Sequence, residues 1–206
     1  MFSDRTDAGR QLAPLLSQYR DAQRCIVLAL PRGGVPVCAE VARALHLPLD
    51  VLVVRKLGFP GHEEYAVGAI AAGGIHVTGE DVPAVAHVLK RERRELQRRE
   101  HEYREHCAPL DLHGMTALLV DDGLATGLSM RAAVIAARAL GAASVVVAVP
   151  VGSVEACQAL RGMGAPCADE VVCMQVPEPF VAVGHWYRSF GATSDEEVRR
   201  ILAQWR

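Results

Sequence analysis

The chain has 206 residues, of which 50% are hydrophobic and 22% are charged, and its formal net charge at pH 7 is −2. This composition is typical of one globular domain, and it excludes disorder over the whole chain. The near balance of charges offers no general attraction for nucleic acids or anionic membranes.

Targeting signals are also missing from the sequence pattern. The longest uncharged stretch, Ala139–Val154, is interrupted by Gly141 and Pro150 and is shorter than the roughly 20 apolar residues of a membrane-spanning helix. The first ten residues, MFSDRTDAGR, contain acids and no apolar run, unlike a signal peptide. The six cysteines form no CxxC pair. We therefore expect reduced thiols, a cytoplasmic location and no membrane partner.

Short apolar runs alternate with amphipathic segments, which is typical of a parallel sheet with helices on both faces. The predicted strands are Cys25–Leu30, Leu49–Val54, Thr116–Val120, Ser144–Val149 and Glu170–Met174. The predicted helices are Asp7–Tyr19, Val35–Leu45, Asp81–His106, Gly127–Leu140, Val154–Arg161 and Asp195–Gln204. Two further runs flank Gly73–Gly74 and predict a hairpin, Ala66–Ala71 with Ile75–Thr78. We predict one α/β domain over residues 1–206, with an open, mostly parallel central sheet.

A glycine-rich turn, Pro31-Arg32-Gly33-Gly34, follows the first predicted strand and leads into a helix. Successive amides in such a turn can bind an anion, and Arg32 adds a positive charge. A simple turn is the alternative. The next predicted strand ends in Arg55 and Lys56, followed by a glycine-rich segment. These two cations can belong either to a binding loop or to a solvated surface loop.

The long predicted helix is highly charged, because Lys90–His106 contains seven Lys or Arg and five Glu residues. A solvated, salt-bridged surface explains this pattern, and an RNA-binding face is the alternative. The mixed signs weigh against nucleic acid as a partner.

Two acids follow the buried strand Thr116–Val120, and a glycine- and hydroxyl-rich turn then leads into an alanine-rich helix. Asp121 and Asp122 should therefore lie at the carboxyl end of a central strand, where open α/β sheets bind ligands. The turn at the helix N-terminus can hold a phosphate. A phosphorylated ribose with a free diol and a bound metal ion fits both features.

The segment LLVDDGLATGLS resembles the phosphoribosyl-pyrophosphate (PRPP) signature of the type I phosphoribosyltransferases, although Gly123 departs from the usual residue after the acids. The resemblance implies that the acids bind the ribose hydroxyls and that the turn binds the 5′-phosphate. The implied PRPP-binding residues are Asp121, Asp122, Gly123, Leu124, Ala125, Thr126, Gly127, Leu128 and Ser129.

The same resemblance extends to the two earlier segments. It implies a pyrophosphate-binding set of Arg32, Gly33, Gly34, Arg55 and Lys56, with a strained cis peptide that Gly33 would accommodate best. The segment Leu57–Glu64 would be a mobile lid over pyrophosphate. The implied catalytic residues are Asp121, Asp122, Arg55 and Lys56.

An aromatic-rich segment near the C-terminus is similar to the family's hood, in which the acceptor base stacks. Phe180, Trp186 and Tyr187 are the candidate acceptor-binding residues, and closure of a small hydrophobic core is the alternative. The domain would then have a core of about 21–175 and a hood from about 1–20 and 176–206.

The implied function is Mg²⁺-dependent transfer of the phosphoribosyl group of PRPP to an unidentified nitrogenous acceptor, with release of pyrophosphate. Mg²⁺ would be held through PRPP, with no site held mainly by protein atoms. Ala125 stands where relatives that use 6-oxopurines have an acid, so we expect hypoxanthine and guanine to be poor acceptors. A PRPP- or nucleotide-sensing regulator that binds RNA or DNA is the alternative, and a hydrolase of a phosphorylated ribose is a third hypothesis. The sequence is also compatible with a homodimer.

Overall fold

The computed structural model describes residues 1–59, 62–71, 74–78, 85–105, 107–161 and 167–206. Its centre is a parallel sheet of five strands in the order β2-β1-β6-β7-β8. The strands are β1 (Cys25–Ala29), β2 (Leu49–Val51), β6 (Thr116–Val120), β7 (Ser144–Val151) and β8 (Glu170–Gln175). The predicted α/β class with an open parallel sheet is confirmed.

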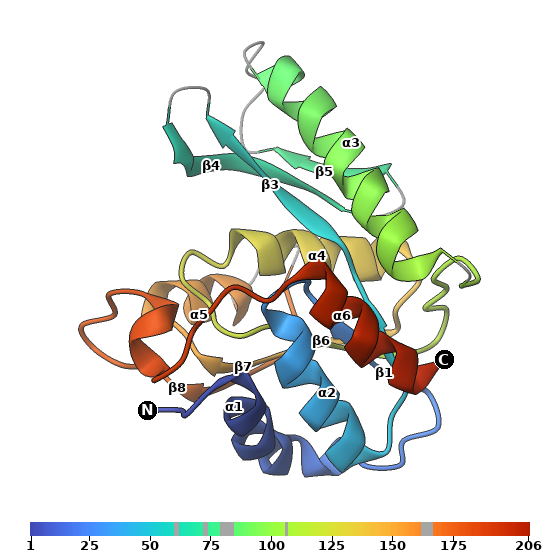
Figure 1. Ribbon diagram of the computed structural model, residues 1–206, viewed down its shortest axis with the longest axis vertical. Helices are drawn as coiled ribbons and strands as arrows, with labels where there is room; N and C mark the ends of the chain where they lie inside the picture. Colours follow the sequence, from blue (N-terminus) through green and yellow to red (C-terminus); the bar gives the residue numbers. More distant parts are fainter. Residues whose placement is uncertain (60–61, 72–73, 79–84, 106, 162–166) are drawn as a thin grey trace.

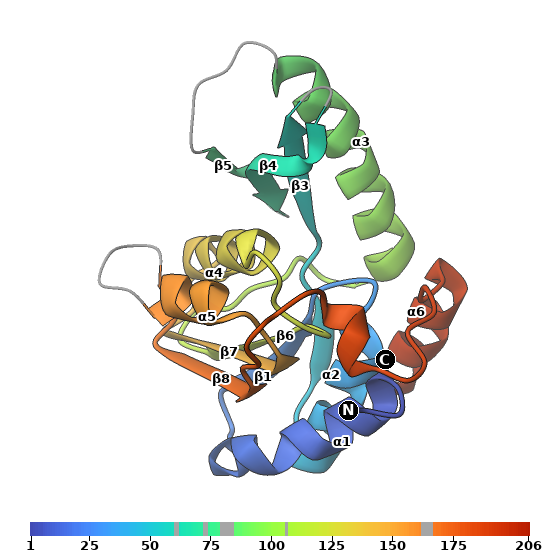
Figure 2. The ribbon, with the colours of Figure 1, turned by 90° about the vertical axis from the view of Figure 1, so that its left-hand side faces the viewer.

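Helices cover both faces of this sheet, as Figures 1 and 2 show. One face packs against α1 (Arg5–Leu12), α2 (Gly34–Leu45) and α6 (Asp195–Leu202), and the other against α4 (Leu128–Ala139) and α5 (Val154–Arg161). The central strands are buried along nearly their whole length. Their continuous apolar runs are therefore explained by cover on both sides.

The register of the central strands brings two loops together. β1 and β6 pair in parallel from Cys25 opposite Thr116 to Ala29 opposite Val120. Because both strands end at the same level, the turn after β1 and the acidic turn after β6 start side by side.

A second, antiparallel sheet of order β3-β4-β5 lies outside the central sheet, with the helix α3 (Val85–Arg104) packed against it. Its strands are β3 (Val54–Phe59), β4 (His62–Ala71) and β5 (Ile75–Thr78). The predicted hairpin is confirmed by the pairing of β4 with β5. Gly73 and the predicted helical residues 81–84 and 106 lie outside the described residues.

Two predicted elements differ from the structure. The strand predicted over Leu49–Val54 ends at Val51, and Val54 begins β3 in the other sheet. The segment predicted as a lid loop, Leu57–Glu64, contributes to both strands of the β3–β4 hairpin. Backbone pairing between β3 and β4 outweighs the local turn preference of Gly58. Pro60 and Gly61 of the predicted lid lie outside the described residues.

The helix predicted over Asp7–Tyr19 also differs at both ends. It begins earlier, at Arg5, because the Asp4 side chain accepts a hydrogen bond from the amide of Asp7. From Ala13 to Tyr19 the chain continues as a 3₁₀ helix, and Pro14, near its start, cannot donate the backbone hydrogen bond that an α-helix needs.

The N-terminal segment pairs with the C-terminal segment that precedes α6. Phe2 forms a bridge with Tyr187, and the Phe2 amide donates a 2.7 Å hydrogen bond to the Trp186 carbonyl. Within the described ranges, no helix is both long and apolar enough to cross a lipid bilayer. The division into a core and a hood made from the chain ends stays a prediction.

Candidate functional site

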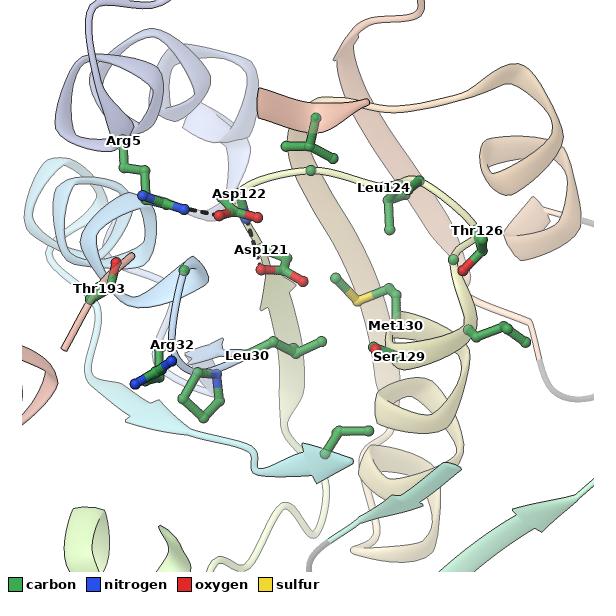
Figure 3. Close-up of a pocket in the computed structure, with 18 of the residues that line it drawn as sticks. Arg5, Leu30, Arg32, Asp121, Asp122, Leu124, Thr126, Ser129, Met130 and Thr193 are labelled. Atoms are coloured by element: carbon green, nitrogen blue, oxygen red, sulfur yellow. Dashed lines mark hydrogen bonds and ion pairs between the residues drawn. The ribbon is translucent and has the colours of Figure 1, made fainter. Parts of the chain in front are cut away.

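A cavity of about 450 Å³ opens at the carboxyl ends of β1 and β6. Five stretches of chain surround it: the start of α1, the turn after β1, the start of β3, the turn after β6 and the C-terminal segment before α6 (Figure 3). Its lining includes every residue of the predicted PRPP-binding turn. The lining residues are Arg5, Leu30, Pro31, Arg32, Gly33, Val54, Asp121, Asp122, Gly123, Leu124, Ala125, Thr126, Gly127, Leu128, Ser129, Met130, Val183, Phe190, Ala192 and Thr193.

The two acids lie side by side on one wall of this cavity. The Asp121 carboxylate accepts a 2.8 Å hydrogen bond from the Asp122 amide, which fixes the start of the turn. The Asp122 side chain is only 15% exposed. Burial raises the pKa of Asp122, and the neighbouring guanidinium of Arg5 opposes that rise. The charge of the Asp122 carboxylate therefore depends on the balance between its burial and one nearby cation.

Opposite the acids, the turn ends at the N-terminus of α4. Gly127 is the N-cap residue and has a φ of +73°, a left-handed conformation that glycine adopts at little cost. The first amides of α4 have no partner within the helix and point outward at its N-terminus. Thr126 and Ser129 add hydroxyl groups at the same place in the cavity lining (Figure 3). This arrangement suits an anion such as a phosphate group.

The turn after β1 approaches the acids closely. A methyl group added to Gly33 would lie 2.2 Å from Oδ2 of Asp122, and one added to Gly34 would lie 2.9 Å from the Val120 carbonyl oxygen. Both positions therefore require glycine for space. The cis peptide expected in this turn is present between Pro31 and Arg32. Gly33 itself lies outside this bond and has an ordinary helical conformation, with φ −60° and ψ −34°. The expectation that Gly33 accommodates the cis bond is therefore wrong.

The predicted pyrophosphate cations are divided between two places. Arg32 lines the cavity, and its guanidinium lies 3.7 Å from the carboxylate of Asp195 at the start of α6. Arg55 is not among the lining residues: it forms a 2.5 Å ion pair with Glu92, a nearly buried residue of α3. The structure therefore does not bring Arg55 to the acids. The side chain of Lys56 lies outside the described part of the chain.

The three candidate acceptor-binding aromatics belong to, or pack against, one small hydrophobic cluster. Tyr187 is buried, and its hydroxyl donates a 2.6 Å hydrogen bond to the Asp122 carbonyl oxygen. Trp186 packs with Tyr187 in a small hydrophobic cluster around Phe2. Phe180 also packs against this cluster, as the hydrophobic-core alternative expects. It lines, in addition, a second cavity of about 920 Å³ on the other side of the PRPP-binding turn, together with Ala125 and Thr126.

One cavity residue, Arg5, has no counterpart among the sequence predictions. Its Nε donates a 2.8 Å hydrogen bond to Oδ2 of Asp122, across 117 positions of sequence. No local motif marks this residue, since it precedes the predicted first helix. Only the pairing of the two chain ends brings it to the cavity.

Comparison with known proteins places these features in a family. The family model described as the phosphoribosyl transferase domain matches residues 4–174. A Mycobacterium tuberculosis (strain H37Rv) protein named "Putative phosphoribosyl transferase Rv0571c" is 48% identical over 210 residues, covering 98% of this chain and 46% of the relative. The chain thus spans about half the length of the curated relatives it matches.

Solved structures agree with this. The crystal structure of TT1426 from Thermus thermophilus is 42% identical and superposes with a TM-score of 0.84, covering 99% of this chain and 98% of the other. The AQ2163 protein from Aquifex aeolicus, at 10% identity and a TM-score of 0.53, shares the fold over 84% of this chain and 74% of its own. With its fold and its LLVDDGLATGLS turn, the chain belongs to the phosphoribosyl transferase domain family.

Proposed function

We propose that this protein is a Mg²⁺-dependent phosphoribosyltransferase that binds PRPP and transfers its phosphoribosyl group to a nitrogenous acceptor, releasing pyrophosphate. The observation that carries the proposal is the placement of paired acids, a helix N-terminus and a glycine turn around one cavity. A ribose diol, a 5′-phosphate and a pyrophosphate each find chemically suitable groups there.

In this proposal, Asp121 and Asp122 accept hydrogen bonds from the two ribose hydroxyls. The amides that begin α4, with Thr126 and Ser129, bind the 5′-phosphate. Arg32 and the turn after β1 face the pyrophosphate. As the bond to pyrophosphate breaks, positive charge develops on the ribose ring, and the two carboxylates stabilise it.

Mg²⁺ prefers hard oxygen donors to thiols or imidazoles, and the pyrophosphate and ribose oxygens of PRPP would supply them. In the described part of the chain, no three His, Cys, Asp or Glu side chains form a metal cluster. We propose that the metal is held mainly by substrate oxygens. When bound, Mg²⁺ would neutralise charge on the pyrophosphate leaving group.

The second cavity is the proposed acceptor site. Phe180 supplies an aromatic wall, and Ala125 and Thr126 belong to both cavities, so an acceptor there would lie next to PRPP. Ala125 offers only a methyl group. An acceptor that needs a proton removed by the residue at this position is therefore disfavoured.

The proposal is tested by calorimetric titration of PRPP with Mg²⁺ into the wild-type chain and into the double variant Asp121→Asn, Asp122→Asn. We expect the double variant to stay folded and to lose PRPP binding. Asp111→Asn is the matched control, since Asp111 is an exposed acid that does not line the cavity. Unchanged affinity in the folded double variant would contradict the assignment.

A screen of nucleobases with PRPP and Mg²⁺, scored by pyrophosphate release, then separates catalysis from regulation. Release that requires a nitrogenous acceptor supports the transferase. PRPP binding without turnover, together with salt-dependent binding of RNA, would favour the regulator instead.

A further inference from the structure

The guanidinium group of Arg5 makes three contacts with other residues. Its Nε donates a 2.8 Å hydrogen bond to Oδ2 of Asp122, and its Nη1 donates a 2.6 Å hydrogen bond to the Gly191 carbonyl oxygen. Its guanidinium carbon lies 3.9 Å from the centre of the Phe190 ring. The side chain is only 12% exposed. The side chain is therefore much more ordered than a surface arginine usually is. The planar guanidinium group, whose N–H donors form a rigid fork, can make these contacts at the same time.

The backbone explains why this arginine reaches the cavity. The segment before α1 pairs with the C-terminal segment: the Arg188 amide donates to the Phe2 carbonyl, and the Ser189 amide donates to the Ser3 carbonyl. The Asp4 cap then starts α1 at Arg5. The position of Arg5 is therefore set by both chain ends, close to the turn after β1.

We propose that Arg5 is a positioning residue, which holds the Asp122 carboxylate in its charged form and turns one defined oxygen of it toward the ribose. Arg5 binds Oδ2, so Oδ1 remains as the acceptor for a ribose hydroxyl. In Figure 3, Arg5 reaches Asp122 from the side away from Thr126 and Ser129. Arg5 thus acts through Asp122. The part of this inference that concerns ribose rests on the proposed function.

The surroundings of Asp122 make a cation necessary. Burial raises its pKa, and of the neighbouring groups Arg5 is the one that lowers it through charge and hydrogen bonding. In the described part of the chain, the Cys38 thiol of α2 and the Tyr187 hydroxyl also interact with Asp122 from other elements, and neither carries a positive charge. Asp121 adds a second carboxylate beside it. Without Arg5, Asp122 would take up a proton at a higher pH.

The test compares Arg5→Gln and Arg5→Lys with the wild type. Arg5→Gln removes the charge, whereas Arg5→Lys keeps it and loses the fork. Arg10→Gln is the matched control, because Arg10 lies on the same helix, is 68% exposed and pairs with Glu40 outside the cavity. The PRPP dissociation constant is measured with Mg²⁺ at pH 6.0 and pH 8.0. Each value is divided by the wild-type value at that pH, which cancels titration of PRPP itself.

For Arg5→Gln we expect the ratio to be larger at pH 6.0 than at pH 8.0, approaching tenfold for each unit by which the Asp122 pKa comes to lie above 6.0. For Arg5→Lys we expect a ratio that changes little with pH, and for Arg10→Gln a ratio near one at both. An Arg5→Gln ratio that is the same at both pH values, shared by Arg5→Lys, would overturn the proposal in favour of a purely structural role.

A second measurement does not depend on PRPP. Carbon NMR titration of the Asp122 carboxyl should give a higher midpoint in Arg5→Gln than in the wild type, and a wild-type-like midpoint in Arg5→Lys. An equal midpoint in all three overturns the inference. Failure of the wild type to bind PRPP refutes the proposed function, and the NMR comparison still decides the role of Arg5. If Arg5→Gln does not fold, the midpoint in Arg5→Lys is compared with the midpoint in the wild type. A raised midpoint in Arg5→Lys would contradict the charge argument.

Discussion

Substitution of Gly33 by alanine tests the close approach between the turn after β1 and the acids. The new methyl group would lie 2.2 Å from Oδ2 of Asp122 and 3.3 Å from Nε of Arg5. Ordinary contact between such atoms needs a separation of more than about 3 Å, so the carboxylate must shift by about 1 Å. A shift of that size breaks its 2.8 Å contact with Arg5.

Two opposing terms determine the change in the free energy of unfolding. Gly33 has a helical φ and ψ, so alanine there would by itself stabilise the protein by about 0.4–1 kcal/mol through the unfolded chain. Overpacking costs about 1–3 kcal/mol. The steric term is larger, and we expect a net loss of about 0.5–2 kcal/mol. We also expect PRPP affinity to fall at least about tenfold, which corresponds to about 1.4 kcal/mol.

Urea unfolding and calorimetric titration of PRPP measure the two effects. Gly191→Ala is the control, because a methyl group there would meet no atom within 4 Å, and the carbonyl that binds Arg5 is unchanged. We expect the control to unfold at the wild-type urea concentration or slightly above it. If Gly33→Ala matches the control in both measurements, the steric reasoning about this turn is refuted.

Three further predictions concern single groups. Tyr187→Phe removes the hydroxyl that donates to the Asp122 carbonyl, so the free energy of unfolding in urea should fall by about 1 kcal/mol, and an unchanged midpoint would contradict this. The Tyr103 hydroxyl, with Arg32 and Arg98, lowers the pKa of Asp195. The ionised Asp195 therefore stabilises the folded protein fully above its ordinary pKa of 3.8, and this stabilisation is lost as the pH falls below that value. Asp195→Asn should therefore cost about 1.5 kcal/mol at pH 7 and make acid unfolding below pH 4 less steep, and equal acid sensitivity of both proteins would contradict that sign. Because Ala125 cannot transfer a proton, hypoxanthine and guanine should be poor acceptors with PRPP, and turnover of either above about 1 s⁻¹ would show that this residue has been misinterpreted.

Local patterns predicted the buried central strands and the amphipathic helices that pack on them. The strand Thr116–Val120 and the helix Val154–Arg161 have the predicted bounds. Continuous apolar runs and helical periodicity are properties of neighbouring residues, so they can be recognised without knowing the fold. The acidic turn after β6 was recognisable for the same reason.

Features that depend on distant pairing could not be found in this way. Gly58 lies in a glycine-rich segment that is typical of a loop, yet β3 continues through it by pairing with β4. The sequence near Arg55 indicates a cation at the end of a strand without a partner. In the structure, Glu92 of α3 forms an ion pair with it. Arg5 is the clearest case, because its partner Asp122 is 117 positions away and nothing near either residue specifies the other.

The position of the second sheet in the chain has a consequence for how the protein folds. β1 pairs with β2 on one side and with β6 on the other, and β3, β4, β5 and α3 are all made between these two neighbours. On the ribosome, more than half of the chain must therefore emerge before β1 can pair along its second edge. Closing a loop costs about 0.6 kcal/mol more for each doubling of its length, so halving the length of chain between β1 and β6 would ease their pairing by about that amount. Until β6 arrives, the apolar strand β1 presents an open edge, and that interval is when the nascent chain is most exposed to aggregation.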